Sequence, residues 1–201
     1  MRSNEMGVRG EAWLVTGLGN PGDHYAETRH NIGAWALDRL AETLGVRLRK
    51  VRFMPVDAAE ATMDGNRVHL VRTRSFMNRS GPPIAGFARK REIPVERIVV
   101  CHDEIDLPLG ALKIKRGGST AGHNGLNSLV SALHSPDFIR VRMGVGRPRG
   151  RKDPADHVLE SFAKGEREEA DILAADAAAA ALTVVREGLA AAQDRFNRGT
   201  G

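Results

Sequence analysis

The sequence predicts a single α/β domain in which a mixed, twisted β-sheet is flanked by helices. Short apolar segments typical of strands alternate along the chain with segments in which apolar residues recur at the helical period of about 3.6 residues. The length of 201 residues suits one domain that buries most of its apolar surface. We expect this domain to cover residues 13–201, after a flexible N-terminal extension over residues 1–12.

The first half of the domain is predicted to contain a strand, a helix and a hairpin. A short apolar segment ends at Gly17, as a buried strand would, and the helical segment that follows ends at Gly45, a residue suited to the C-cap. The turn-forming pair Asp64-Gly65 separates two further segments and favours an antiparallel hairpin. In chain order we expect a strand over residues 13–16, a helix over 32–44 and hairpin strands over 51–63 and 67–73.

The second half continues the alternation and ends in a long amphipathic helix. The alanine-rich C-terminal segment places one apolar stripe on a helical face, formed by Leu182, Val185, Leu189 and Phe196. In chain order we expect a helix over residues 83–91, strands over 97–102 and 111–115, a helix over 126–133, a strand over 139–145, a loop over 147–154 and the closing helix over about 165–196.

The composition argues against several classes of protein. No stretch of about 18 consecutive apolar residues occurs, so no membrane span is predicted. The first twelve residues lack the apolar core of a secretory signal, and we expect a cytoplasmic protein. The single cysteine, Cys101, cannot form an internal disulfide and is expected to be a small buried hydrophobe.

Charge is distributed unevenly along the chain. Through Lys152 there are 25 Lys and Arg residues against 15 Asp and Glu, whereas from Asp153 onward there are 5 against 10. A basic surface raises the rate of encounter with nucleic acid and supplies affinity through phosphate neutralisation. The basic part is therefore predicted to face a polyanion, although a merely solvated arginine-rich surface would have the same composition.

Two glycine-containing patterns suggest other chemistries, but their context argues against both. Gly17, Gly19 and Gly22 fit the G-x-G-x-x-G pattern of dinucleotide sites, yet about ten polar residues separate this turn from the next predicted helix. Residues 117–121 approach the G-x-S-x-G elbow of serine hydrolases, but the last glycine is missing and no apolar strand leads into the serine. Nucleotide binding remains an alternative function, and a serine nucleophile is not expected.

Five segments together resemble the signature motifs of bacterial peptidyl-tRNA hydrolases. In order along the chain, they are Gly17-Leu18-Gly19-Asn20-Pro21-Gly22 with Tyr25, Thr28-Arg29-His30-Asn31, Phe76-Met77-Asn78, His102-Asp103-Glu104-Ile105-Asp106-Leu107-Pro108 and Gly122-His123-Asn124-Gly125-Leu126. The similarity extends from Trp13 to the C-terminal helix. It implies a monomeric α/β enzyme, without cofactor or metal, that cleaves the ester between a peptide and the 3′ ribose of tRNA and so recycles tRNA from stalled peptidyl-tRNA.

The residues themselves suit ester hydrolysis by an activated water. With an unperturbed pKa of about 6.5, a histidine such as His30 can accept the proton of water at neutral pH. Asp103, expected just beyond the strand over 97–102, is the carboxylate we place against the other ring nitrogen of His30. There it would fix the tautomer and stabilise the imidazolium that forms.

Asparagines and apolar side chains are expected to complete the site. By resemblance, Asn20 and Asn124 bind the part of the substrate next to the ester, and Asn78 contacts the peptide main chain or the oxyanion. An amide offers a donor and an acceptor without adding charge, and a neutral site around Asn20 would reject a free, cationic amine. Apolar walls and further substrate contacts are assigned to Tyr25, Phe76, Met77, Gly122 and His123, although Phe76 and Met77 would equally suit a core.

Basic residues on two predicted strands are candidates for binding tRNA. Lys113 and Lys115 alternate on one strand and so point to the same side. By resemblance, Lys115 and Arg142 form a clamp on the 5′ phosphate. Contact with the acceptor stem is expected to extend to Arg147, Arg149, Arg151 and Lys152. Because aromatic residues make up only 4% of the chain, recognition through shape and phosphates is favoured over base stacking.

One segment departs from the family pattern, and one alternative function stays open. Ser119-Thr120-Ala121 replace part of a glycine-rich run, and their side chains are expected to stiffen that loop. The cluster over residues 102–106 contains potential metal ligands, but no second set at recognisable spacing accompanies it. A structural hydrogen bond is expected for Asp106 instead. The alternative is a non-catalytic RNA-binding relative, against which the intact His30, Asn20 and Asp103 argue.

Overall fold

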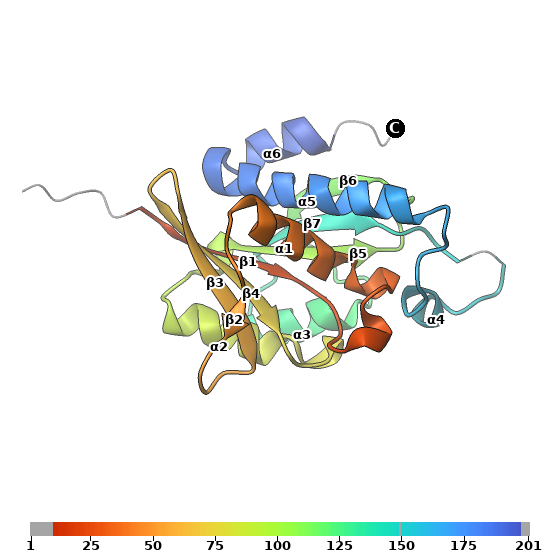
Figure 1. The fold of residues 1–201 in the computed structure, drawn as a ribbon, viewed down its shortest axis with the longest axis horizontal. Coiled ribbons are helices and arrows are strands. Elements are labelled where there is room, and N and C mark those ends of the chain that lie inside the picture. Colours follow the sequence, from red (N-terminus) through yellow and green to blue (C-terminus); the bar gives the residue numbers. More distant parts are fainter. Residues whose placement is uncertain (1–9, 149, 198–201) are drawn as a thin grey trace, which may run out of the picture.

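The computed structural model describes residues 10–148 and 150–197, and within them seven strands form one mixed sheet in the order β2-β3-β4-β1-β5-β7-β6. Helices cover both faces of this sheet (Figure 1). The predicted fold class, a single α/β domain with a mixed sheet, is confirmed. Residues 1–9 of the predicted N-terminal extension lie outside the described residues, and Ala12, its last member, already begins β1.

Four parallel strands form the centre of the sheet. They are β4 (Asn66–Thr73), β1 (Ala12–Gly17), β5 (Ile98–Glu104) and β7 (Ile139–Gly144). Antiparallel strands complete the edges, namely β2 (Arg49–Lys50) and β3 (Val56–Met63) beside β4, and β6 (Leu112–Arg116) beside β7. Because β1, β4 and β5 are parallel neighbours, the loops that follow them open at the same edge of the sheet, where α/β proteins place their ligand sites.

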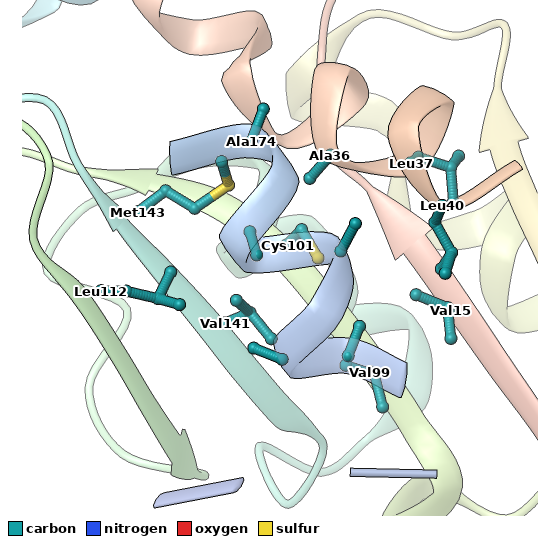
Figure 2. Close-up of a cluster of buried hydrophobic side chains, with 14 of the residues drawn as sticks. Val15, Ala36, Leu37, Leu40, Val99, Cys101, Leu112, Val141, Met143 and Ala174 are labelled. Atoms are coloured by element: carbon teal, nitrogen blue, oxygen red, sulfur yellow. The ribbon is translucent and has the colours of Figure 1, made fainter. Parts of the chain in front are cut away.

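Alternate side chains of the strands point into two separate cores. One core packs under α1 (Ile32–Thr43), α5 (Arg167–Glu187) and α6 (Leu189–Phe196), and Figure 2 shows part of it, with Val15, Val99 and Cys101 of the sheet facing Ala36 and Leu40 of α1. The other core lies under α2 (Gly81–Lys90) and α3 (Asn124–Leu133). Cys101 is 1% exposed, and burial raises the pKa of its thiol to about 12, so the prediction of a buried hydrophobe is confirmed.

Several predicted elements differ from the observed ones. The first hairpin strand begins at Val56 rather than at residue 51, because residues 51–55 form a turn in which Phe53 has a φ of +62°. Asp103 lies inside β5 rather than beyond it. The predicted closing helix is two helices, since Gly188, with a φ of +91°, ends α5 and precedes α6. The predicted loop over 147–154 leads into a short helix, α4 (Pro154–Val158), with Asp153 as its N-cap.

Short 3₁₀ turns shape the loops at the open edge of the sheet. Between β1 and α1 the chain forms η1 (Asp23–Tyr25) and η2 (Arg29–Asn31), and between β4 and α2 it forms η3 (Met77–Arg79). A further turn, η4 (Val95–Arg97), precedes β5. Among the described residues, no helix combines the length and the apolar character that crossing a lipid bilayer requires.

A close backbone contact fixes α1 on the sheet. A Cβ atom at Gly33 would lie 2.3 Å from the carbonyl oxygen of Cys101, and one at Gly17 would lie 1.9 Å from the carbonyl oxygen of Gly33. Side chains at either position would therefore push the helix away from β1 and β5. Because η2 leads directly into α1, these glycines also set how closely η2 approaches the end of β5.

We predict that Gly33→Ala destabilises the protein by roughly 1–3 kcal/mol, because the added methyl group overpacks the contact between α1 and β5. Urea unfolding checks this. Gly86→Ala in α2 is the matched control, since its Cβ would meet only Met54, at 3.8 Å. Replacing glycine by alanine inside a helix should there add about 0.5–1 kcal/mol. Equal stabilities of the two variants would contradict the predicted contact.

Candidate active site

A cavity of about 800 Å³ opens at the edge where β1, β4 and β5 end. Residues at the end of β5 and in the segments that follow β1, β4, β5, β6 and β7 line it. The cavity thus lies where the parallel arrangement of β1, β4 and β5 is expected to place a site. It contains all of the predicted catalytic residues and most of the predicted substrate contacts, namely Asn20, Tyr25, His30, Phe76, Met77, Asn78, Asp103, Gly122, His123 and Asn124.

The predicted contact between His30 and Asp103 is confirmed. His30 lies in η2, and its Nδ1 is 2.9 Å from Oδ1 and 3.0 Å from Oδ2 of Asp103 near the end of β5. Both residues are buried, with 8% and 3% of their surface exposed. Because Nδ1 is engaged by the carboxylate, Nε2 is the ring nitrogen left for a molecule in the cavity.

A second histidine shares the same carboxylate. Nε2 of His123 lies 2.9 Å from Oδ1 of Asp103. The other ring nitrogen of His123, Nδ1, accepts hydrogen bonds from the backbone N–H groups of Gly125 and Leu126, at 3.1 and 3.3 Å, and so caps α3. An accepting Nδ1 carries no proton, so Nε2 carries the hydrogen that it donates to Asp103.

Sequence analysis had assigned His123 to substrate binding and missed this contact. A histidine is not among the usual N-cap residues, so nothing in its position one residue before α3 indicated a capping role. For the same reason, the predicted start of the helix at residue 126 was two residues late, since α3 begins at Asn124.

The electrostatics of the pair favour a charged Asp103 and a basic His30. Burial lowers the pKa of His30, but the charge of Asp103 and the hydrogen bond from Nδ1 together outweigh it, and the pKa is raised above its usual 6.5. Burial also disfavours the ionised form of Asp103. The neighbouring His30 and His123 overcome this penalty and hold the pKa of Asp103 well below its usual value.

His102 lies beside this pair and stays neutral. Burial lowers the pKa of His102 to about 3, with the neighbouring His123 adding to the effect. Its Nδ1 lies 2.7 Å from the backbone carbonyl oxygen of Asp103, and its ring makes an edge contact with that of His123 at 5.2 Å between centroids. His102 thus supports the backbone of Asp103 and the ring of His123. Because it is neutral, it does not form a competing ion pair with the carboxylate of Asp103.

Asn20 is held in place by two neighbours. The side chain of Asn31 brackets its backbone, with Oδ1 accepting from the N–H of Asn20 at 2.8 Å and Nδ2 donating to its carbonyl oxygen at 2.9 Å. Oδ1 of Asn20 accepts from the backbone N–H of Met77 at 2.8 Å, which ties β1's loop to η3. The group that Asn20 can offer to a ligand is therefore its NH₂, a donor.

Apolar side chains and α4 form the walls of the cavity. The rings of Tyr25 and Phe76 meet edge to face at 6.2 Å between centroids, and Phe76 remains 54% exposed. Val158 and the exposed Leu159, which sequence analysis did not identify, add an apolar wall at the end of α4. Met77 is buried at 4% exposed, so it serves the core as well as the cavity.

Arg29 fastens the wall of α4 to the turn that carries His30. Its Nη1 donates to the carbonyl oxygens of Glu160 and Ser161, at 3.2 and 2.9 Å, and its Nη2 lies 2.6 Å from Oε2 of Glu166. Thr28 and Ser161 also form an isolated antiparallel bridge. Arg29, the residue before His30, therefore connects η2 to the segment that follows α4.

The predicted basic residues form a strip on one face of the sheet, outside the cavity. In the antiparallel pairing of β6 with β7, Lys113 lies opposite Arg142 and Lys115 lies opposite Arg140, so all four side chains share one face. The guanidinium of Arg142 contacts Oε2 of Glu104 at 3.0 Å, and within the described residues Glu104 is its only carboxylate partner. We call these four cations the basic strip.

The predicted extension of the basic strip is partly neutralised. Arg147 pairs with Asp106, whose structural hydrogen bond is thereby confirmed, and Lys152 pairs with Glu160. Arg151 is exposed, and Arg149 lies outside the described residues. The carboxylate partners reduce the cationic character that the sequence suggested for this loop.

His30, Asp103 and His123 are also the one group among the described residues that could offer three metal-ligand atoms, within 4.8 Å of one another. The hydrogen-bond pattern gives these atoms another use. Nδ1 of His30 and Nε2 of His123 both donate to Asp103, and a metal ion would have to displace both hydrogens. The arrangement suits a carboxylate stabilised by two donors.

The family model described as peptidyl-tRNA hydrolase matches residues 14–200. Relatives with that name include one from Nocardia farcinica, 47% identical over 92% of this chain and 95% of its own, and one from Frankia casuarinae, 48% identical over 92% and 93%. The crystal structure of peptidyl-tRNA hydrolase from Acinetobacter baumannii superposes with a TM-score of 0.87 at 33% identity, covering 93% of this chain and 95% of that one. The chain thus belongs to the peptidyl-tRNA hydrolase family.

Proposed function

We propose that this protein hydrolyses the ester between a peptide, or an N-blocked amino acid, and the 3′ ribose of tRNA, with His30 as the general base. The observation that carries the proposal is the contact of Nδ1 of His30 with the buried Asp103, at 2.9 Å, in a cavity lined by amides. That contact leaves Nε2 unprotonated and available to a water molecule, as base catalysis requires.

The proposed reaction proceeds in two proton transfers. Nε2 of His30 accepts a proton from water as the water oxygen attacks the ester carbonyl carbon, and Asp103 stabilises the imidazolium that forms. The tetrahedral intermediate then collapses, the bond to the 3′ oxygen of tRNA breaks, and the imidazolium returns the proton to that oxygen. An ester has a good leaving group, so no covalent intermediate with the protein is needed.

His123 is proposed to hold Asp103 rather than to contact the reacting atoms. The hydrogen bond from its Nε2 to Oδ1 fixes the carboxylate while Nδ1 is occupied by α3. The carboxylate therefore stays beside Nδ1 of His30, where its charge and hydrogen bond raise the pKa of the proposed base.

Asn20 is proposed to select substrates whose α-nitrogen is blocked. Its Oδ1 is occupied by Met77, so it presents NH₂ to the cavity. A donor suits the carbonyl oxygen of a peptide or acyl group, whereas a free α-ammonium brings only further donors and a charge that is costly to bury. Asn78 and Asn124 are proposed to bind the rest of the peptide backbone and the developing oxyanion.

The basic strip is proposed to bind the acceptor end of the tRNA, with Lys115 and Arg142 on the 5′ phosphate. Among the described residues, the strip carries four cations, and Glu104 is the one carboxylate that forms an ion pair with it. Burial lowers the pKa of Lys115, and the charges of Arg142 and Arg140 lower it further, which an incoming phosphate would reverse. We further propose that the protein acts as a monomer. A non-catalytic RNA-binding role would leave the His30–Asp103 pair without a use.

We predict that His30→Ala lowers the rate of release of N-acetylated amino acid from tRNA by on the order of 10²–10⁴, because the base is lost. The assay compares N-acetylaminoacyl-tRNA with free aminoacyl-tRNA, with EDTA present throughout. The wild type should hydrolyse only the blocked substrate. Rapid turnover by His30→Ala, or loss of wild-type activity in EDTA, would contradict the proposed mechanism.

The pH profile offers a second test. The pKa of His30 is raised, and the base must be neutral, so kcat/KM should fall as pH drops through an apparent pKa above about 6.5. In Asp103→Asn the raising charge is gone and burial still lowers the pKa, so this acid limb should move to lower pH while kcat falls about a hundredfold or more. An unmoved acid limb in the variant would show that His30 is not the titrating base.

Substitutions in the basic strip should mainly change the affinity for tRNA, whereas substitutions in the cavity should mainly change the rate of hydrolysis. We predict that Lys115→Ala mainly weakens tRNA binding and reduces the slope of log K against log salt by about 0.7–0.9, because one phosphate contact is lost, whereas kcat falls far less than in His30→Ala. Lys90→Ala, at the exposed C-terminal end of α2, is the matched control and should leave the slope unchanged. Identical slopes for the Lys115 and Lys90 variants would remove Lys115 from the tRNA site.

A further inference from the structure

The segment over residues 117–122, here called the strip loop, connects the basic strip to the cavity. It leaves β6 directly after Lys115 and Arg116, and it ends at His123, which contacts Asp103. Thr120, Ala121 and Gly122 line the cavity. We propose that Arg140 is a positioning residue that fixes the strip loop and, through it, couples the bound 5′ phosphate to the orientation of the catalytic carboxylate. This inference rests on the proposed function.

The side chain of Arg140 is hydrogen-bonded to the backbone of the strip loop. Its Nη1 and Nη2 donate to the carbonyl oxygens of Ser119 and Gly118, each at 2.7 Å. The residue is only 1% exposed, and its guanidinium lies over the ring of Phe138, 5.0 Å from the centroid. Within the described residues its Nε has no hydrogen-bond partner, and no carboxylate forms an ion pair with it. A buried cation of this kind is costly unless it holds something in place.

The strip loop needs such a support because its three glycines are costly to order and its Ala121 has a strained backbone conformation. Gly117, Gly118 and Gly122 have φ values of +63°, +91° and +80°, and Ala121, which is not a glycine, has +48°. Side chains of the loop add two further contacts, Oγ1 of Thr120 to Oδ1 of Asn127 at 2.5 Å and the N–H of Ala121 to Oγ of Ser119 at 3.1 Å. The stiffening predicted for Ser119 and Thr120 therefore has a physical basis in these hydrogen bonds.

The phosphate side of the loop lies against Lys115. A Cβ atom at Gly118 would be 2.8 Å from Nζ of Lys115, so the lysine side chain rests on the backbone whose carbonyl group Arg140 holds. A phosphate that draws Lys115 and Arg142 toward itself would change this contact. A change in the position of Lys115 would therefore be felt first at the backbone of Gly118, whose carbonyl group Arg140 holds.

The catalytic side of the loop ends on the shared carboxylate. The N–H of His123 donates to the carbonyl oxygen of Thr120 at 2.9 Å, and its ring donates to Asp103. His102 packs against that ring, and the charge of Arg140 adds to the burial that lowers the pKa of His102. Successive contacts thus lead from Lys115 through the strip loop to His123, Asp103 and His30.

A direct role of Arg140 in binding phosphate fits the structure less well. Both terminal nitrogens already donate to carbonyl oxygens, and the side chain is enclosed, whereas Lys113, Lys115 and Arg142 on the same face are partly exposed. A planar fork that meets two consecutive carbonyl oxygens is a geometry that lysine cannot reproduce. Arg140→Lys therefore keeps the charge of the strip and removes the support of the loop.

The kinetic test uses N-acetylaminoacyl-tRNA with a 5′ phosphate or a 5′ hydroxyl and the variants Arg140→Lys, Thr120→Val and Arg89→Met. Arg89→Met is the matched control, an exposed arginine that donates to the carbonyl oxygen of Ala132. We expect Arg140→Lys to lower kcat about tenfold to a hundredfold, as a small misplacement of reacting groups does, and to shrink the advantage of the 5′-phosphorylated substrate in kcat. Thr120→Val should act in the same direction and more weakly, and Arg89→Met should match the wild type.

A spectroscopic test is independent of turnover, and its comparison of the two hairpins on the wild type needs no variant. The His123 Nε2–H resonance of the wild type is recorded by NMR with a short acceptor-stem hairpin that carries a 5′ phosphate or a 5′ hydroxyl. We expect the phosphate to shift this resonance in the wild type and in Arg89→Met, to shift it less in Thr120→Val, and not to shift it in Arg140→Lys. Equal shifts in all four proteins, or Arg140 variants with wild-type kcat and wild-type preference for the phosphate, would overturn the inference. A wild type that hydrolyses neither substrate would instead refute the proposed function.

Discussion

The carboxylate of Asp103 is the group on which the rest of the site depends. It is 3% exposed and ionised, and burial alone would make that state unfavourable. Two imidazole N–H donors offset the penalty, one from η2 and one from the start of α3. Removing either donor leaves a buried charge partly unsatisfied, which is more costly than never having buried it. The site is therefore a three-residue unit in which each histidine has a different second task.

The fold brings this unit together through strand direction and close backbone contacts. Parallel pairing of β1 with β5 puts the turn that carries His30 and the end that carries Asp103 at one edge. The contact of Gly33 with the carbonyl group of Cys101 then lets α1 approach β5 without an intervening side chain. His123 arrives from the other face of the sheet, at the start of the helix that its own ring caps. The segments that lead into α1 and α3, on opposite faces of the sheet, thus contribute one histidine each.

Much of this arrangement could be predicted from the sequence, and the failures have physical reasons. The fold class, the helix after residue 32, the buried Cys101 and the His30–Asp103 contact were predicted correctly. Period and turn signals did not show that Asp103 is within β5, because a carboxylate inside a buried strand is favourable only through partners distant in sequence. The apolar wall of α4 likewise depends on contacts made in three dimensions. The cap by His123 and the break at Gly188 are local, but histidine is an unusual N-cap residue and a glycine can also be tolerated inside a helix. The roles of the individual residues remain proposals.

The attachment of α4 by Arg29 separates two properties of the site. The wall residues Val158 and Leu159 project from a short helix, while the anchoring bonds reach only backbone carbonyl oxygens of residues 160 and 161 and the side chain of Glu166. The identity of the wall side chains is thus free to vary without loosening the turn that holds His30, the proposed base. A cavity built in this way can change its apolar wall, in nature or by engineering, while the contact between His30 and Asp103 stays the same.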